Sequence, residues 1–511
     1  MSSFLHARAR RRHRALGVDV FGSLSLVGAL IKYLSLATLF PTAFAIGYSE
    51  PVWPFLATGV AVGALGWLLE RVPGSKDAVG VREGFLVVSL TWLLAAAVGA
   101  LPYLLSGEDQ LASPVDAYFE SMSGFTTTGA TVLTDVEALP NSLVMWRQLT
   151  QWLGGMGIIV LALAVLPRLR VGGRQLLEHE LPGPEFDQMT ARIRDTARRL
   201  WALYVALTVA MVAILVAISW TGLDDRMSPF EALAHALSTL PTGGFSTEAR
   251  GAEAFGAASQ WVIAGFMALA GVNFALLYRG FVRRHPGPLV RDEEFRLYCA
   301  LIVAAAGLVI AELWSEGVLQ GEEAVRHGLF QVISMLTTTG AASADFNVWP
   351  LFAAIVLIAA MLSGGSAGST SGSVKVVRHL LLGRMLRREL DQTVHPEVVS
   401  RVRLNGVPVD ERILRAVSSF VLLYVGVFAL GALALVGDAA RVDLDLRLLD
   451  AVAAAATTLG NVGPAFGFAG PMGSFDPFSD ASKGVMIALM WLGRLEIIPV
   501  AVLLSRHYWR V

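Results

Sequence analysis

The sequence predicts an all-α polytopic membrane protein. Hydrophobic residues make up 55% of the 511 residues and charged residues only 16%, whereas about a quarter of the residues of a typical soluble domain are charged. The apolar residues gather in long runs, and several reach the roughly 20 residues that cross about 30 Å of hydrocarbon as a helix. A pattern of these runs also recurs about every hundred residues. A soluble helical core would not separate so many apolar runs by polar loops.

Two continuous spans begin the chain and four similar repeats follow them. The two spans lie at about 24–47 and 52–70, which is long enough to cross a bilayer. Each repeat has a long apolar span, a shorter apolar segment, a break rich in Thr and Gly, and a second long span. The repeats lie at 84–167, 198–282, 294–383 and 414–506. We therefore divide the chain into the N-terminal segment with two additional spans at 1–80 and pore repeats at 81–180, 181–290, 291–405 and 406–511.

The short apolar segment of each repeat predicts a re-entrant half-helix. Apolar runs of about 10–14 residues are too short to cross the bilayer and are typical of re-entrant segments. Two of the four begin with a proline, Pro114 or Pro229, at the first helical position, where the missing N–H costs nothing. The four segments are 114–125, 229–240, 323–336 and 447–459.

A break rich in small residues follows each half-helix. Non-helical backbone at membrane depth is tolerated only where protein buries it or water lines it. Four matched breaks on one side of the membrane therefore indicate one shared aqueous axis. The breaks read SGFTTTGAT at 123–131, TLPTGGFST at 239–247, MLTTTGAAS at 335–343 and TTLGNVGPA at 457–465. Aligned on glycine, they centre on Gly129, Gly243, Gly340 and Gly460.

The residue types in the breaks predict a pathway for a small monovalent cation. A cation that loses its water needs oxygen dipoles without a fixed counter-charge, and backbone carbonyls supply them in potassium channel filters. Glycine permits the backbone angles that turn carbonyls inward, threonine adds hydroxyls and stiffness, and the helix C-termini add partial negative charge. The candidate filter residues, which are the candidate K⁺ ligands, are Thr127, Thr128, Gly129, Thr242, Gly243, Gly244, Thr338, Thr339, Gly340, Leu459, Gly460 and Asn461.

At these residues the chain resembles the TrkH/KtrB superfamily of potassium transport subunits, and the two additional spans favour the TrkH branch. The motifs that carry the resemblance are TTTGAT at 126–131, TGGFST at 242–247, TTTGA at 337–341, TLGNVGP at 458–464 and WLGRLEI at 491–497. The resemblance implies four membrane–pore–membrane units around a pseudo-fourfold axis, in a homodimer with one pore per protomer. It also implies a cytosolic regulatory partner of TrkA type that binds a nucleotide, ATP/ADP or NAD(H). Pro241 and Leu459 depart from the pattern, so we expect a modest preference for K⁺ over Na⁺.

A second segment rich in Gly and Ser, LSGGSAGSTSGSVK at 362–375, interrupts the second span of the third repeat. Each glycine destabilises a helix by about 1 kcal/mol relative to alanine, so we expect an unwound stretch. No GK[ST] follows, which excludes a phosphate loop, whereas close helix packing through small residues is an alternative. The resemblance implies an intramembrane gate loop formed by Gly364, Gly365, Ser366, Ala367, Gly368, Ser369, Thr370, Ser371, Gly372 and Lys375.

Arg494 is a charge inside the last span, where an unpaired cation is costly. Pairing with Glu496 is one interpretation, but residues two apart on a helix do not face each other. We expect Arg494 to reach the pore and bind carbonyls of the gate loop as an electrostatic and steric barrier.

Basic residues concentrate on one side of the predicted membrane. Most of the 40 Lys and Arg residues lie in segments that face the cytoplasm if the chain starts inside, among them 8–14, 168–199 and 375–415. Cytoplasmic loops carry such an excess, so we expect a multi-pass protein of the plasma membrane, the inner membrane of a bacterium, with both termini cytoplasmic. The two long loops are candidate docking surfaces for the regulatory partner or for anionic lipid. We expect no nucleic-acid partner and no cofactor in this chain.

Two other functions are weighed against a channel. A secondary active symporter that couples K⁺ to H⁺ or Na⁺ would be favoured by an acid in a broken helix, but the breaks contain none, although Glu120 and Glu231 lie in half-helices. A membrane-embedded hydrolase would need a histidine paired with a nucleophile, and the nine histidines, including His235 and His327, show no such arrangement in the sequence. We therefore expect a transport protein and not an enzyme.

Overall fold

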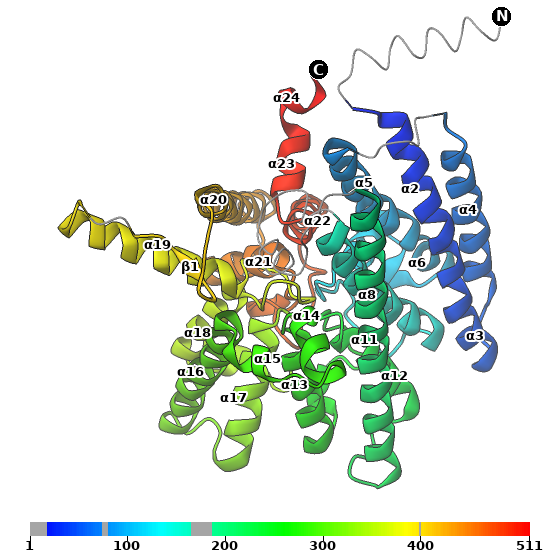
Figure 1. The fold of residues 1–511 in the computed structure, drawn as a ribbon. Helices are drawn as coiled ribbons and strands as arrows, with labels where there is room; N and C mark the ends of the chain where they lie inside the picture. The colour runs from blue at the N-terminus through cyan, green and yellow to red at the C-terminus, as the bar shows by residue number, and fades with distance from the viewer. Residues whose placement is uncertain (1–17, 74–79, 165–185, 398–399, 511) are drawn as a thin grey trace, which may run out of the picture.

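The computed structural model describes residues 18–73, 80–164, 186–397 and 400–510, and their ordered elements are almost entirely helical (Figure 1). Two helical spans come first: α2 (Val20–Leu34) continues through the 3₁₀ turn η1 (Ser35–Thr38) into α3 (Leu39–Gly47), and α4 (Trp53–Glu70) follows. The Arg-rich segment 8–14 and most of the loop 168–199, which the sequence marks as cytoplasmic, lie outside the described residues.

Four repeats with the same order of elements follow the two spans. Each has an outer helix, a short pore helix and an inner helix that ends or bends. The first repeat contains α5 (Val81–Gly99), α6 (Leu101–Ser106), the pore helix α7 (Pro114–Phe125) and α8 (Asn141–Ala164). The second contains α11 (Phe186–Trp220), the pore helix α12 (Pro229–Thr239), α13 (Ala257–Ala270) and α14 (Phe274–Leu277). The third contains α16 (Glu293–Ser315), the pore helix α17 (Gly321–Leu336), α18 (Leu351–Ser363) and α19 (Val376–Val394). The fourth contains α20 (Glu411–Val442), the pore helix α21 (Leu448–Gly460), α22 (Asp480–Arg494) and α23 (Ile498–Leu504).

Short elements connect these helices. The strands β1 (Arg403–Leu404) and β2 (Val407–Pro408) form an antiparallel pair between α19 and α20. The others are η2 (Asp109–Leu111), η3 (Gly251–Ala254), the π-helical η4 (Tyr278–Val282), α15 (Gly287–Arg291), η5 (Phe346–Val348), η6 (Gly467–Ala469) and α24 (Arg506–Trp509).

The helices confirm the predicted fold class, an all-α polytopic membrane protein with two spans ahead of four membrane–pore–membrane repeats. In the described part of the chain, 6 helices are long and apolar enough to cross a membrane, and up to 8 if each bent pair counts as one span. Two pore helices begin as the sequence predicts. Pro114 and Pro229 occupy their first turns, and the hydroxyls of Ser113 and Ser228 accept backbone N–H groups of those turns, which caps the helix.

The inner helices of the second and fourth repeats break, although the sequence predicted a break only in the third. The segments on either side of residues 271–273 meet at 104°, and those on either side of residues 495–497 meet at 115°. Asn273 caps the new helix by accepting from the amides of Ala275 and Leu276. Glu496 and Ile497 have φ angles of 59° and 55°, which an α-helix does not allow. Arg494 therefore ends a helix and does not lie inside one.

Helices α2 and α4 pack backbone to backbone at two glycines. A Cβ atom at Gly66 would lie 2.5 Å from the Lys32 amide nitrogen, and one at Gly28 would lie 2.5 Å from the Glu70 amide nitrogen. The Lys32 ammonium also pairs with the Glu70 carboxylate at 2.6 Å. Small residues at such crossings let membrane helices approach closely, and this contact holds the two additional spans together.

We expect Gly66→Ala to destabilise the protein, because a methyl group has no space between the two backbones. Overpacking of this kind typically costs about 1–3 kcal/mol. The matched control is Gly63→Ala in the same helix, since a Cβ there meets only the Ser35 side chain, at 3.4 Å. Thermal unfolding in detergent would show a lower midpoint for Gly66→Ala alone; equal midpoints for the two variants would contradict the contact.

Candidate functional site

Each of the four pore helices is followed by a residue in the left-handed conformation at an equivalent place. The residue at this place in each repeat has φ between 52° and 57°. A β-branched residue rarely adopts this conformation, so its recurrence in three threonines indicates a backbone that the surrounding structure holds in place. The four residues are Thr127, Thr242, Thr338 and Asn461.

Backbone hydrogen bonds fix how the four segments correspond. In each repeat the amide that follows the left-handed residue donates to a carbonyl in the last turn of the pore helix, at 2.8 or 2.9 Å. The donor and acceptor pairs are Thr128 and Ser123, Gly243 and Ser238, Thr339 and Ser334, and Val462 and Thr457. A glycine with positive φ comes next in every repeat: Gly129, Gly244, Gly340 and Gly463.

This correspondence corrects the alignment on glycine. Gly244 and Gly463, and not Gly243 and Gly460, are equivalent to Gly129. Leu459 and Gly460 belong to helix α21, and the segment that the sequence placed at 459–461 corresponds structurally to 461–463. The physical reason is Asn461, because asparagine tolerates the left-handed conformation better than most residues, so the helix can continue to Gly460 before the chain turns.

The four glycines close a ring around one axis. A Cβ atom on each glycine would collide with the carbonyl oxygen of the residue before the equivalent glycine in the next repeat. Gly129 faces the Gly243 oxygen at 2.1 Å, and Gly244 faces the Thr339 oxygen at 2.0 Å. Gly340 faces the Val462 oxygen at 1.7 Å, and Gly463 returns to the Thr128 oxygen at 2.8 Å. The four breaks therefore converge, as the shared axis requires.

A cavity of about 360 Å³ opens on one side of the ring. All four equivalent glycines line it, together with residues that follow them in each repeat, including Thr131, Ser246, Ala342 and Pro464. Arg147 and Glu248 contribute charged groups to the same lining. The cavity therefore meets all four segments of the ring.

The ring is not symmetric in its side-chain partners. The Thr128 hydroxyl contacts that of Thr126 at 2.7 Å and accepts from the Asn461 amide at 3.0 Å. The Gly243 carbonyl instead accepts from the Gln151 side-chain amide at 2.7 Å. At the positions equivalent to Thr128, the second and fourth repeats have Gly243 and Val462, which carry no hydroxyl. The four repeats thus offer unequal sets of oxygen atoms.

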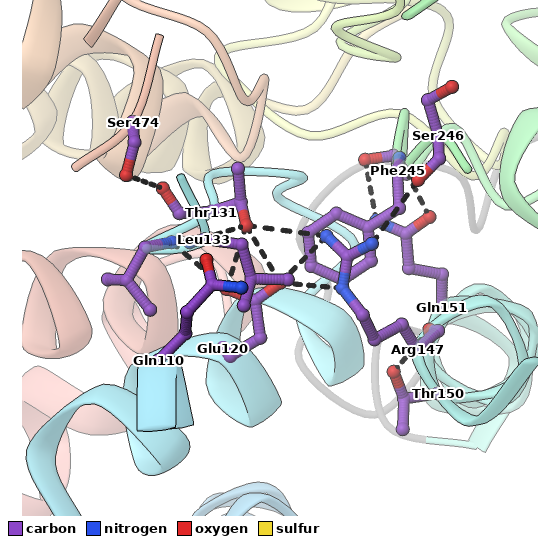
Figure 2. A network of polar contacts seen from close by, with 12 residues as sticks. Gln110, Glu120, Thr131, Leu133, Arg147, Thr150, Gln151, Phe245, Ser246 and Ser474 are labelled. Atoms are coloured by element: carbon purple, nitrogen blue, oxygen red, sulfur yellow. Dashed lines mark hydrogen bonds and ion pairs between the residues drawn. The ribbon is translucent and has the colours of Figure 1, made fainter. Parts of the chain in front are cut away.

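Each of the first three pore helices holds the outer part of its own segment by a side-chain hydrogen bond. Glu120 accepts from the Thr131 hydroxyl at 3.0 Å (Figure 2). His235 contacts the Ser246 hydroxyl at 3.1 Å, and His327 contacts the Ser343 hydroxyl at 2.9 Å. The sequence did not predict these two histidine–hydroxyl contacts. These pairs link a pore helix to the segment that follows it.

Residues 364–375 form a loop between α18 and α19, in the place where the sequence predicted an unwound stretch. The loop bonds to the base of the ring, since the Gly372 amide donates to the Thr338 hydroxyl at 2.7 Å and the Thr370 hydroxyl donates to the Leu240 carbonyl at 3.1 Å. A Cβ at Gly372 would lie 2.3 Å from the Gly460 carbonyl oxygen. The loop thus lies directly against three of the four segments.

The same loop bonds to the breaks of both neighbouring inner helices. On the side of the second repeat, the Ser366 amide donates to the Gly271 carbonyl at 2.9 Å and the Phe274 amide donates to the Gly368 carbonyl at 3.0 Å. On the side of the fourth repeat, Arg494 donates to the Thr370 carbonyl at 3.0 Å and to the Gly154 carbonyl at 3.2 Å. This is the carbonyl contact expected of Arg494, whose side chain is buried.

Two buried carboxylates also contact the loop. Glu496 pairs with Lys375 at 3.0 Å and with Arg378 at 2.5 Å, and not with Arg494. Glu294 accepts from the Ala367 amide at 2.6 Å. The four breaks rich in Thr and Gly contain no acid, but Glu496 lies in a further break, between α22 and α23, that the sequence did not predict. Two cations compensate its charge, as a buried carboxylate requires.

The sequence analysis missed several residues that hold the ring. Arg147 and Gln151 lie in α8, inside an apolar span, and a polar residue in such a span marks a candidate functional position. That signal was available for both. No sequence signal distinguishes Glu294 from the other acids near helix ends.

Comparison with known proteins assigns the family. The TrkH family, described as cation transport protein, matches residues 54–510. The Trk system potassium uptake protein TrkH of Escherichia coli (strain K12) is 37% identical over 492 residues, which cover 95% of this chain and 98% of that protein. The Trk system potassium uptake protein TrkG of the same organism is 34% identical over 491 residues, 95% of this chain and 98% of that protein.

A solved structure shares the fold described above. The crystal structure of the potassium transporter TrkH from Vibrio parahaemolyticus superposes with a TM-score of 0.86 at 34% sequence identity, over 96% of this chain and 100% of that chain. The agreement in sequence and in structure extends over nearly the whole length. This chain therefore belongs to the TrkH family of cation transport proteins.

Proposed function

We propose that this chain is a potassium uptake subunit whose pore conducts K⁺, and to a smaller extent Rb⁺ and Na⁺, in the manner of a channel. The observation that carries the proposal is the closed ring of four glycine segments below a cavity that all four line. Backbone oxygens of 127–129, 242–244, 338–340 and 461–463 would replace part of the water shell of the ion. The names of the relatives, which are potassium uptake proteins, support K⁺ as the ion.

The loop at 364–375 is the proposed gate. It lies against the base of the ring and is bonded to the breaks in the second and fourth repeats. Arg494 is the proposed barrier, because a buried guanidinium bonded to the Thr370 carbonyl places a positive charge beside the loop. A fixed positive charge next to the path of a cation raises the energy of the ion there.

Coupled symport of K⁺ with H⁺ or Na⁺ is the second candidate function. The observation in its favour is Glu496, a carboxylate in the break of an inner helix. Lys375 and Arg378 pair with this carboxylate, however, and opposite charges this close stabilise the ionised form. The contacts therefore support a structural anchor of the loop more than a proton carrier.

We also propose the setting in which the subunit works. It is a multi-pass membrane protein, and the excess of basic residues on one side supports an orientation with both termini cytoplasmic in a bacterial inner membrane. The family resemblance supports a homodimer and a cytosolic TrkA-type partner that binds the regulatory nucleotide, so this chain would need no cofactor of its own. Light scattering of the purified protein and co-purification with such a partner test the two assemblies.

Purified protein in liposomes should take up K⁺ and Rb⁺ faster than Na⁺ and Li⁺, and Gly340→Ser should reduce this preference several-fold. A side chain at Gly340 would meet the Val462 oxygen and would add about 1–2 kcal/mol of strain, because the residue has a positive φ. Gly307→Ser in α16 is the control, since a Cβ there meets nothing within 4 Å. Tracer uptake of the four ions measures the series; an unchanged series in Gly340→Ser would remove this residue from the filter.

Arg494→Gln should raise K⁺ uptake, because it removes the positive charge beside the gate loop. Arg494→Lys keeps the charge and should stay close to the wild type. A buried charge repels a cation far more strongly than an exposed one, so we expect a difference of roughly tenfold between the two variants. Uptake is normalised to the amount of reconstituted protein, and equal rates for the Gln variant and the wild type would argue against a barrier.

Thr338→Val should also raise uptake, because it leaves the Gly372 amide without its acceptor. An unsatisfied buried N–H costs about 1–3 kcal/mol, which would favour displacement of the loop. Thr127→Val is the matched control, since Thr127 has the same backbone conformation and its hydroxyl has no partner among the described residues. Single-channel recording would show a higher open probability for Thr338→Val only. The same increase in both variants would show that the bond between Thr338 and Gly372 does not hold the loop closed.

A further inference from the structure

A buried ion pair lies behind the first segment of the ring. Arg147 of α8 donates through Nε to Glu120 of α7 at 2.8 Å, and a second guanidinium nitrogen lies 2.8 Å from the same carboxylate oxygen. The side chains are 1% and 0% exposed. The carboxylate also accepts from the Thr131 hydroxyl at 3.0 Å and from the Val132 amide at 3.1 Å. The pair thus joins the pore helix, the inner helix and the outer end of the first segment.

Arg147 also reaches the second repeat (Figure 2). Its Nη1 donates to the Ser246 carbonyl at 3.2 Å, and its guanidinium lies over the Phe245 ring at 4.1 Å. These two residues directly follow Gly244, the ring glycine of that repeat. A planar guanidinium that bonds a carboxylate on one side and a carbonyl on the other fixes the distance between the two. One arginine thus sets the separation of the first and second segments.

In the part of the chain that the structure describes, the other repeats have no equivalent of this pair. The backbone correspondence puts His235, Gln331 and Ala454 at the place of Glu120. His235 and Gln331 bond only to a serine hydroxyl of their own segment, Ser246 and Ser343, or to their own pore helix. Ala454 has no polar side chain. The ion pair therefore makes one side of the ring chemically different from the rest.

The pair also sets the local charge beside the first segment, in a cavity lining to which Glu248 adds a separate negative charge. Arg147 lines the cavity together with the four ring glycines, so its positive charge lies beside the proposed path of a cation. Glu120 is in direct contact with it and cancels this charge. Without the carboxylate, the guanidinium would be a buried and unpaired cation at the entrance, which is costly for the protein and repels the ion.

We propose that Glu120 and Arg147 are positioning residues for ion selectivity: they hold the first and second segments at a fixed separation, and Glu120 compensates the positive charge of Arg147 at the entrance. The proposal rests on the proposed function of the ring as a cation filter. A pair that served only to hold helices together would change the amount of folded protein and leave the discrimination between ions intact.

The test compares Glu120→Gln, Arg147→Gln and the double variant Glu120→Gln/Arg147→Gln in liposomes, with K⁺ and Na⁺ uptake normalised to reconstituted protein. Glu120→Gln leaves the positive charge at the entrance, so K⁺ uptake should fall roughly tenfold or more. Arg147→Gln removes that charge, so K⁺ uptake should be kept while the K⁺/Na⁺ ratio falls. The double variant should recover K⁺ uptake relative to Glu120→Gln and still show the lower ratio.

The control is a second ion pair between repeats that contacts no filter segment in the described structure. Lys483 of α22 pairs with Asp116 of α7 at 2.5 Å, with exposures of 5% and 14%. Asp116→Asn/Lys483→Gln should keep the wild-type K⁺/Na⁺ ratio even if less protein folds. Glu120→Arg/Arg147→Glu adds a further measurement, because reversal keeps the charges paired and should retain more K⁺ uptake than Glu120→Gln.

The outcomes separate this proposal from the proposed function. If wild-type liposomes take up none of these cations, the filter assignment itself fails. If the wild type conducts and the Glu120 and Arg147 variants keep its K⁺/Na⁺ ratio, with uptake reduced equally in both single variants, the pair is structural and the inference is overturned. A fall in K⁺ uptake in Glu120→Gln but not in Arg147→Gln, with a reduced K⁺/Na⁺ ratio in Arg147→Gln and in the double variant, would support it.

Discussion

The close approach of a glycine to a carbonyl oxygen, repeated four times around one axis, is the contact on which the rest of the structure depends. At the closest point, a Cβ on Gly340 would lie 1.7 Å from the Val462 oxygen, so a side chain there would push two repeats apart. The four pore helices must therefore end at the same depth and turn in the same way. The left-handed residues two positions before these glycines, three of them threonines, have a strained backbone conformation. Packing against the neighbouring repeats holds them in it.

The backbone of the ring is nearly fourfold, but its supports are not. Gln151 donates to the Gly243 carbonyl, Asn461 donates to the Thr128 hydroxyl, and the Gly372 amide of the loop at 364–375 donates to the Thr338 hydroxyl. A chain with four unequal repeats can give each segment a different task. In this structure the third repeat provides the loop and the fourth provides the arginine that holds it. The first provides the ion pair that connects it to the second.

Much of this architecture could be predicted from the sequence, because apolar length and the recurrence of Thr and Gly report directly on membrane spans and re-entrant breaks. The two additional spans, the four pore helices and the loop at 364–375 all follow from such patterns. The register of the fourth segment could not be predicted, since a glycine at Gly460 looks equivalent to Gly129 until the helix is seen to continue to it. The bends at 271–273 and 495–497 were missed because their backbone is set by contacts with the loop and not by local composition. The partners of Arg147 could not be predicted either, since Glu120 precedes it by 27 residues and Ser246 follows it by 99, in another repeat.

Helix α18 ends at Ser363 and α19 starts at Val376, so the loop at 364–375 is attached to one long helix that extends away from the body of the molecule (Figure 1). The large apolar side chains of its far half, Leu386, Leu390 and Val394, are exposed. The corresponding inner helices α13 and α22 end beside the loop, at Ala270 and Arg494, so neither extends past it as α19 does. Lys375, which precedes α19, and Arg378 in its first turn both pair with Glu496, so this protruding helix is tied at its root to the inner-helix break of the fourth repeat.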